Sequence, residues 1–240
     1  MKTNALCAAM LFAAASLLAA DSTPKDDVVN ASKKLAGSDN YSWTTKVEMA
    51  NFTPGPTEGK TQKDGLIYIT FNFQDNTMTG IVKNGKGAIK TDDGWQSLED
   101  ATKDDGGGGG FNPVRFTAMR LQNLKVPTDE AIDVAGKTKS LTNVDGVISG
   151  DLTADGVKSL SRFGRRRQGG GNPPEIKDPK GSVKFWIKDG VLTKYEYKVS
   201  GSMDFNGEDR PIDRTVTTEF KDIGTTKITV PDEAKSKMST

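Results

Sequence analysis

The chain of 240 residues carries 33 Lys and Arg against 32 Asp and Glu, a formal net charge of +1, and 34% of its residues are hydrophobic. It has no His and a single Cys, which excludes histidine-based acid–base catalysis, Ser–His triads and Cys/His metal sites. The balanced charge gives no basic surface for a nucleic-acid partner, and we expect no metal, no cofactor and no enzymatic activity.

The first 20 residues have the pattern of a secretory signal peptide. Lys2 precedes an apolar run from Ala5 to Leu18, and the small residues Ala19-Ala20 end it. The run is shorter than the ~20 residues that a membrane-spanning helix needs. We therefore predict export with cleavage near Ala20, which places residues 21–240 in the periplasm or outside the cell. Cys7 is removed with this segment, so no disulfide and no lipid-anchoring cysteine are expected in the mature chain.

The N-terminal part predicts one helix and then a meander of strands. An apolar stripe indicates a short amphipathic helix at residues 26–35. Alternation of apolar and polar residues predicts strands at 41–49 and 66–73, and a hairpin over 77–91 around the Asn84-Gly85 turn. The segment 51–63 holds two Pro and two Gly, so we expect a loop there.

The central part predicts short helices between two glycine-rich loops, at 103–111 and 164–174. Asn112-Pro113 and Pro127 each begin a predicted helix, and Thr153 caps another. A hairpin is expected around Asp145-Gly146. The first loop lacks the Gly-Lys-Ser/Thr of a phosphate-binding P-loop, and its acidic residues do not match the ligand spacing of an EF-hand.

The C-terminal part predicts an antiparallel meander with one apolar face. Period-two alternation marks strands at 182–188, 191–199, 214–221 and 226–230, and Asp189-Gly190 provides a tight turn between the first two. A last helical turn is expected from Pro231. Together these patterns predict an α+β fold over residues 21–240, a single domain in which short helices cover the apolar face of an antiparallel sheet.

Three side-chain groups allow more than one interpretation. Arg165, Arg166 and Arg167 form the densest charge cluster; they are either a solvated loop or a dock for phosphate and anionic lipid headgroups. Trp186 has the opposite parity to its apolar neighbours, which indicates a surface aromatic or a second apolar layer. Acidic residues on the last strands, such as Glu196 and Glu219, alternate with lysines, as surface ion pairs do.

The segments from Gly181 to Tyr197 and from Phe220 to Ala234, and Gly150-Asp-Leu-Thr153 before a helix, resemble the periplasmic lipoprotein-carrier superfamily of LolA-like and LppX/LprG-like proteins. The resemblance covers most of the mature chain. It implies a strongly curved antiparallel sheet, a half-barrel, with helices on its concave face and an apolar cavity for acyl chains between them. The chain departs from anchored members of the superfamily, since it has no lipobox cysteine, and it has two long Gly-rich insertions.

On this basis we expect an exported binding or carrier protein for a lipid or a lipidated chain, with envelope proteins or a membrane surface as further partners. The alternative is a non-enzymatic cell-envelope interaction module with a filled core. Arg165, Arg166 and Arg167 are the candidate headgroup or anion site. The candidate residues of the apolar cavity are Trp43, Ile69, Phe71, Phe73, Phe116, Leu121, Leu160, Phe185 and Tyr197.

Export is tested by N-terminal sequencing of the protein from a cell-envelope fraction. The expected first residue is Asp21 or a close neighbour, because small residues precede it in the manner of a signal-peptidase site. Recovery of a chain that still begins with Met1 would rule the prediction out.

Overall fold

The computed structural model describes residues 22–50, 52–73, 76–103, 112–161, 175–205 and 208–238. The predicted signal peptide, the arginines of the cluster and nearly all of both glycine-rich loops lie outside these residues. The helices are α1 (Pro24–Ala36), α2 (Leu98–Lys103), α3 (Pro113–Gln122), α4 (Pro127–Gly136), α5 (Ala154–Leu160) and α6 (Asp232–Met238). The strands are β1 (Asn40–Met49), β2 (Thr57–Gln62), β3 (Ile67–Phe73), β4 (Asn76–Lys83), β5 (Lys86–Thr91), β6 (Gly94–Ser97), β7 (Thr142–Val144), β8 (Val147–Asp151), β9 (Ile176–Lys188), β10 (Val191–Phe205) and β11 (Glu208–Lys221).

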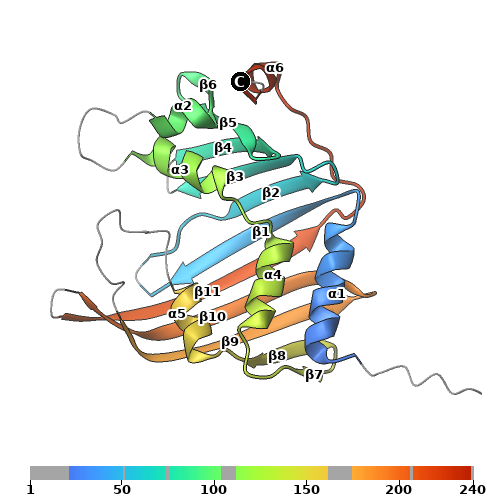
Figure 1. Cartoon of the computed structure of the whole chain (residues 1–240), viewed down its shortest axis with the longest axis vertical. Helices are drawn as coiled ribbons and strands as arrows, with labels where there is room; N and C mark the ends of the chain where they lie inside the picture. Colours follow the sequence, from blue (N-terminus) through green and yellow to red (C-terminus); the bar gives the residue numbers. More distant parts are fainter. Residues whose placement is uncertain are drawn as a thin grey trace, which may run out of the picture.

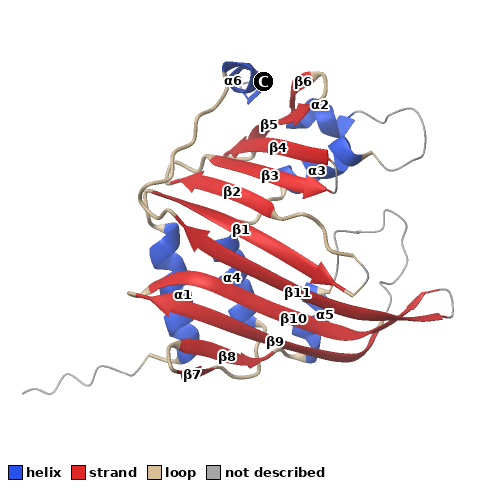
Figure 2. Ribbon diagram, turned by 180° about the vertical axis from the view of Figure 1, so that it is seen from behind, coloured by secondary structure: helices blue, strands red, loops and turns tan. Residues whose placement is uncertain are grey.

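The strands form one curved, open, antiparallel sheet of 11 strands in the order β6-β5-β4-β3-β2-β1-β11-β10-β9-β8-β7. Two meanders therefore meet at its centre, where β1 pairs with β11 from Ser42 opposite Lys221 to Met49 opposite Arg214. Figure 1 shows α1, α3, α4 and α5 on the near face of the sheet, and Figure 2 shows the same sheet from behind. The predicted α+β fold, with short helices on the concave face, is confirmed.

The two faces of the sheet carry different clusters. The helix-covered face contributes Trp43, Ile69 and Phe185 to one large core, together with Leu35 of α1 and Val134 of α4. A second, smaller cluster occupies the opposite face of β3 to β5, where Leu66, Ile81 and Ala88 pack against Ala234 of α6. Around Leu66, Ile81 and Ala88 the sheet is therefore covered on both faces, which agrees with apolar residues of both parities in β3 and β4.

Tight turns connect the strands of the predicted hairpins, at the Asn-Gly and Asp-Gly dipeptides that predicted them. Asn84 and Gly85 have φ values of 52° and 79°, and Asp189 and Gly190 of 54° and 73°. Positive φ at two successive residues gives the twist that a two-residue hairpin needs. The hairpins β4–β5, β7–β8 and β9–β10 confirm the predicted connections.

The prediction of a loop at 51–63 is wrong, because β2 (Thr57–Gln62) lies within it and pairs with both β1 and β3. Its polar sequence and its glycine concealed the strand. The structure supplies the reason for that glycine: a Cβ added at Gly59 would lie 2.0 Å from the Trp43 ring. The indole occupies the space that a side chain on β2 would otherwise fill.

Two further strand predictions need correction. Residues 226–230 alternate like a strand but pair with none in the described structure. Ile228 and Val230 instead pack in the second cluster. Strands β9, β10 and β11 are longer than predicted, because Pro179, Gly201 and Pro211 interrupt the alternation without ending the strands. The helix α2 was not predicted; Ser97 caps it by accepting from the backbone N–H of Asp100 at 3.1 Å.

Replacing Gly59 with Ala is expected to lower the free energy of unfolding by about 1–3 kcal/mol, because the buried Trp43 ring has no room to retreat. Gly136→Ala is the matched control: nothing lies within 4 Å of its added Cβ, and its stability should stay equal or rise by up to about 1 kcal/mol. Urea unfolding of both variants measures the difference. Equal stability of the two variants would contradict the placement of the Trp43 ring in the space above Gly59.

Candidate ligand site

The residues predicted to line an apolar cavity converge on the helix-covered face but are packed together. Trp43, Ile69, Phe71, Leu121, Phe185 and Tyr197 are each at most 3% exposed and belong to one core. A side chain that lined a hollow wide enough for water would keep accessible surface there. These six side chains therefore fill the space between sheet and helices. Phe116 and Leu160 are half-buried, and the side chain of Phe73 lies outside the described residues.

Aromatic rings run across the centre of this face. The centroid of Tyr41 lies 6.0 Å from that of Trp43 and 5.8 Å from that of Phe220. Tyr195 continues the row, 6.1 Å from Phe220 and 6.5 Å from Phe185. These separations are within the range of favourable aromatic pairs. The rings connect β1, β11, β10 and β9, so the two meanders share one aromatic core.

Two glycines on the sheet leave room for leucine side chains of the helices α2 and α3. A Cβ at Gly80 would lie 2.4 Å from Leu121 of α3, and one at Gly87 would lie 2.8 Å from Leu98 of α2. Both leucines thus fill positions where the strands carry no side chain. Apolar contact dominates here: Ala118 and Leu121 of α3 are fully buried, and the Thr117 hydroxyl lies 3.1 Å from the Met78 sulfur.

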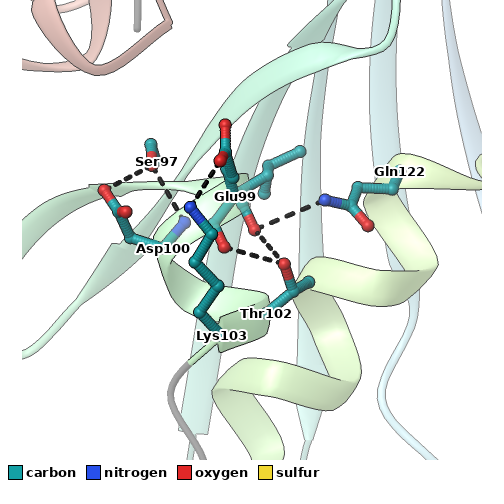
Figure 3. A network of polar contacts seen from close by, with 7 residues as sticks. Ser97, Glu99, Asp100, Thr102, Lys103 and Gln122 are labelled. Atoms are coloured by element: carbon teal, nitrogen blue, oxygen red, sulfur yellow. Dashed lines mark hydrogen bonds and ion pairs between the residues drawn. The ribbon is translucent and has the colours of Figure 1, made fainter.

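A polar network surrounds the start of α2 and reaches α3 through Gln122 (Figure 3). The Ser97 hydroxyl, which caps α2, also donates to the Asp100 carboxylate at 2.7 Å. The Gln122 side chain of α3 donates to the Leu98 carbonyl at 3.4 Å, and Lys103 pairs with Glu99. The Gln122 contact joins α3 to α2, the Ser97 contact ties the start of α2 to the end of β6, and the Lys103–Glu99 pair lies within α2.

The helix α4, in contrast, is attached to the sheet by hydrogen bonds. The hydroxyls of Tyr195 and Tyr197 on β10 donate to the Glu130 carboxylate at 2.6 Å and 3.2 Å. The hydroxyls of Tyr41 and Thr128 lie 3.4 Å apart. Burial, and then the charge of Glu130, raise the pKa of both Tyr195 and Tyr197 above the usual value. Both phenols therefore stay neutral donors, and these hydrogen bonds attach α4 to β10.

Half-buried apolar side chains gather at one end of this face. We call this the open end; it is the end of the sheet at which β1 finishes at Met49 and β2 begins at Thr57. The strands contribute Val47 and Met78 there, and the helices contribute Val114, Phe116 and Leu160. At the other end of the same strands, Tyr41, Ile67 and Val82 are buried. The filled core thus reaches solvent through partly exposed apolar groups at the open end.

Two arginines stand over aromatic rings at the open end. The guanidinium carbon of Arg120 lies 4.8 Å from the centroid of Phe71 and 5.9 Å from that of Phe116. Arg214 lies 5.8 Å from the centroid of Tyr197, and it donates to the Leu160 carbonyl at 3.1 Å. Burial against the rings lowers the pKa of Arg120, and the positive charge of Arg214 lowers it further.

The sequence analysis missed both arginines, although each had a signal. Arg214 has the same parity as Val216 and Phe220, so the alternation of β11 directs its side chain to the core face. Arg120 follows Phe116 by four residues, which places the two side chains on one side of a helix. Trp186, the residue of unexpected parity, lies half-buried on the opposite face with Lys194 Nζ 4.9 Å from its ring. It is a surface aromatic, as one of the two interpretations held.

Other parts of the described structure have fewer features of a binding site. Two surface hollows, of about 180 Å³ beside Lys86 and Glu99 and about 330 Å³ beside Lys60 and Asp222, are lined mainly by polar groups. Within the described ranges, no three His, Cys, Asp or Glu side chains are grouped as metal ligands. None of the helices described there has the length and apolarity to span a bilayer.

Comparisons with known proteins gave structural similarity only. No family model and no curated protein matches the sequence. LprF from Mycobacterium bovis is 14% identical, with 88% of this chain and 97% of that chain covered and a TM-score of 0.42. A LolA superfamily protein from Nitrosomonas europaea is 10% identical, with 87% and 96% covered and a TM-score of 0.31. The second carries the superfamily name that the sequence resemblance gave.

The tyrosine–Glu130 contacts predict how stability depends on pH. In the unfolded chain a tyrosine loses its proton near pH 10, whereas the raised pKa keeps Tyr195 neutral in the folded protein. The stabilisation is complete below pH ~10 and decreases above it, by about 1.4 kcal/mol per pH unit for each such tyrosine.

Tyr195→Phe should therefore be less stable than the parent protein at pH 7, and the difference should shrink above pH ~10. Urea unfolding at several pH values between neutral and strongly alkaline measures it. Titration of lysines affects both proteins alike and cancels in the difference. A difference that stays constant over this range would show that Tyr195 is not held neutral by its surroundings.

Proposed function

We propose that this chain is an exported binding or carrier protein for a lipid or a lipidated chain, with no catalytic role. The observation that carries the proposal is the open end, where half-buried apolar side chains lead directly into the core and two arginines stand over aromatic rings. An acyl chain matches the apolar part of this surface, and a polar headgroup matches its rim. The exported location follows from the predicted signal peptide.

In this proposal the acyl chain does not enter a permanent chamber, because the core is filled. It takes the place of side chains that now occupy the layer, chiefly Leu121 over Gly80 and Leu98 over Gly87. Burial of each methylene contributes about 0.8 kcal/mol. Since the chain replaces one set of apolar contacts by another, much of this gain offsets the cost of moving α2 and α3.

The helix pair α2–α3 is the part of the cover suited to move. Its contacts with the sheet are mainly apolar, apart from the hydrogen bond of the Thr117 hydroxyl to the Met78 sulfur, and the Gln122 side chain of α3 bonds to the Leu98 carbonyl of α2. The helix α4 is attached by Tyr195, Tyr197 and Thr128. We expect α4 to stay in place while α2 and α3 shift as a unit.

The second candidate is a cell-envelope interaction module whose core is never opened. The observation that favours it is the near-complete burial of Trp43, Ile69, Phe71 and Phe185. A protein with this packing needs no ligand to be stable. The two candidates differ in one measurable property, which is whether the folded protein takes up an amphiphile.

Native mass spectrometry of protein purified from the envelope without detergent separates the two functions. A carrier should appear as a lipid-bound species together with the free protein, and solvent extraction should release the lipid. The same protein, delipidated, should take up a fluorescent fatty acid. If it carries no lipid and takes up no probe, the binding proposal is wrong and the interaction module remains.

A disulfide tests the movement of α3. The Cβ of a residue at position 80 would lie 3.2 Å from Leu121 Cγ, which puts Cβ atoms at positions 80 and 121 near the ~3.5–4.5 Å separation of natural disulfides. Residues 21–240 contain no cysteine of their own. In Gly80→Cys/Leu121→Cys, uptake of the fluorescent fatty acid should be lost after oxidation and return after reduction.

The controls are the parent protein under the same oxidant and Leu121→Cys alone, which both keep α3 unlinked. Complete formation of the disulfide is confirmed by mass. Unchanged uptake in the fully oxidised double variant would show that the acyl chain enters without displacing α3 from β4.

A further inference from the structure

We propose that the outer face of β7, β8 and β9, opposite to the face that α1, α4 and α5 cover, is a docking surface for an anionic membrane. The protein would contact the bilayer through three apolar side chains and two lysines, which we call the Trp186 patch: Val144, Val147, Trp186, Lys184 and Lys188. The inference goes beyond the proposed function, and it is compatible with both the carrier and the interaction module.

The strand register brings the apolar side chains of the patch together. Val144 of β7 is opposite Val147 of β8, and Val147 is opposite Trp186 of β9. Directly paired residues of antiparallel strands are neighbours on the same face of a sheet. Val144 is 61% exposed, and Val147 and Trp186 are half-buried. A continuous apolar row therefore reaches from the edge strand to Trp186.

Lysines surround the tryptophan on this face. Lys184 and Lys188 are each two residues from Trp186 on β9, so they share its face, and both are exposed. Lys194 is opposite Trp186 on β10; its Nζ lies 4.9 Å from the centroid of the ring and 3.6 Å from the Glu219 carboxylate. Neither Lys184 nor Lys188 has an ion pair within the described residues. Two of the three positive charges beside the ring thus remain for an anionic partner.

The carboxylates of this corner of the sheet are not direct neighbours of the tryptophan in the register. Glu196 lies opposite Lys184, on β10. Asp145 and Asp189 lie in the turns that connect β7 to β8 and β9 to β10. The surface is therefore positive next to Trp186 and balanced around it, which concentrates the attraction for an anion at the apolar row.

The outer face is covered at the other end of the sheet. There α6 packs against β5 and β6, and Leu66, Ile81, Ala88 and the half-buried Trp95 belong to the cluster beneath it. Figure 2 shows α6 at the β6 edge of this face and, among the described residues, no helix in front of β7, β8 and β9. The apolar row of the Trp186 patch is thus open to solvent, whereas apolar groups on the same face at the other end are buried.

An anionic bilayer matches the patch better than a protein partner does. A stable protein interface takes about 20–30 residues on each side, and the patch has three apolar side chains. Tryptophan prefers the headgroup level of a bilayer, and each lysine beside an anionic surface strengthens binding by about fivefold. The carbon stems of the lysines can lie along the apolar row while their ammonium groups reach lipid phosphates. A second copy of the chain would bring lysines against lysines, which disfavours it.

Co-sedimentation with vesicles tests the docking. One set contains phosphatidylglycerol and phosphatidylcholine, and the other contains phosphatidylcholine alone. We expect residues 21–240 to bind the anionic vesicles in preference to the neutral ones, with an affinity that decreases as salt is added. The Lys184→Gln/Lys188→Gln variant should bind the anionic vesicles about tenfold or more weakly. Val144→Asp should also weaken binding, because it replaces an exposed apolar group by a charge of the membrane's sign.

Lys90→Gln is the matched control for the lysine variant. Lys90 is exposed and has the parity of Ala88, so it lies on the same face at the other end of the sheet, and its loss should leave vesicle binding nearly unchanged. Circular dichroism and urea unfolding confirm that each variant is folded. Uptake of the fluorescent fatty acid should be the same in all of them, since none of these residues lies on the helix-covered face.

Vesicles with brominated acyl chains locate the tryptophan. Bromine quenches the emission of an indole that enters the bilayer. The chain has two other tryptophans, Trp43 in the core and Trp95 in the second cluster. We expect stronger quenching of the parent protein than of Trp186→Phe, which keeps an apolar ring but removes the indole. Equal quenching of the two proteins would overturn the placement of Trp186 at the bilayer.

The remaining outcomes separate the docking surface from the proposed function. Equal binding to neutral and anionic vesicles, or binding that the lysine and valine variants leave unchanged, would overturn the docking surface and leave lipid uptake untouched. Equal binding of poly-glutamate and anionic vesicles would assign the patch to an acidic polypeptide and overturn the membrane assignment. Vesicle binding through the patch in a protein that takes up no fatty acid would support the docking surface and overturn the carrier.

Discussion

The pairing of β1 with β11 is the contact on which the rest of the structure depends. It joins residues about 170 positions apart in sequence, from Ser42 opposite Lys221 to Met49 opposite Arg214. Closing so long a loop has an entropic cost that local contacts do not repay. The aromatic row supplies the compensation, because Tyr41 and Trp43 of β1 meet Phe220 of β11 and, through it, Tyr195 of β10. Without this pairing the two meanders would be separate sheets, and no common face would exist for the helices to cover.

The filled state of that face has a simple origin in residue size. Gly59, Gly80 and Gly87 leave positions on the strands without side chains, and Trp43, Leu121 and Leu98 occupy the space. A sheet that carried large residues at these three positions would hold its helices further away. The same arrangement makes a filled core compatible with the proposed binding function, because another apolar group of similar width can take the place of the Leu121 and Leu98 side chains over these glycines. The polar contacts of α4 with Tyr195 and Tyr197 allow no such exchange.

Sequence patterns predicted most elements of this fold, because alternation and turn dipeptides are local properties. The hairpins at Asn84-Gly85 and Asp189-Gly190 and the cap of α3 at Asn112 all agree with the structure. The failures have non-local causes. The polar strand β2 exists because β1 and β3 flank it and because Trp43 needs Gly59. Residues 226–230 form no strand because they connect β11 to α6, which packs against β5 and β6. For the candidate site, parity identified Trp43, Ile69, Phe71 and Phe185 as inward-facing, but whether their space is hollow depends on volumes that no alternation pattern contains.

The arginines at the open end clarify how affinity and selectivity divide between the two kinds of contact. Burial of an acyl chain is non-directional and would accept any chain that fits, whether its headgroup were charged or neutral. Arg120 and Arg214 lie where the apolar layer reaches solvent, over Phe71 and Tyr197, so a charge placed there keeps part of its hydration while it gains directed hydrogen bonds. An anion deeper in the layer would have to give up its water beside Trp43 and Ile69, at a cost that two arginines would not offset. Among the described residues of this face, the open end is therefore the part that best suits the proposed binding of a charged headgroup together with a buried chain.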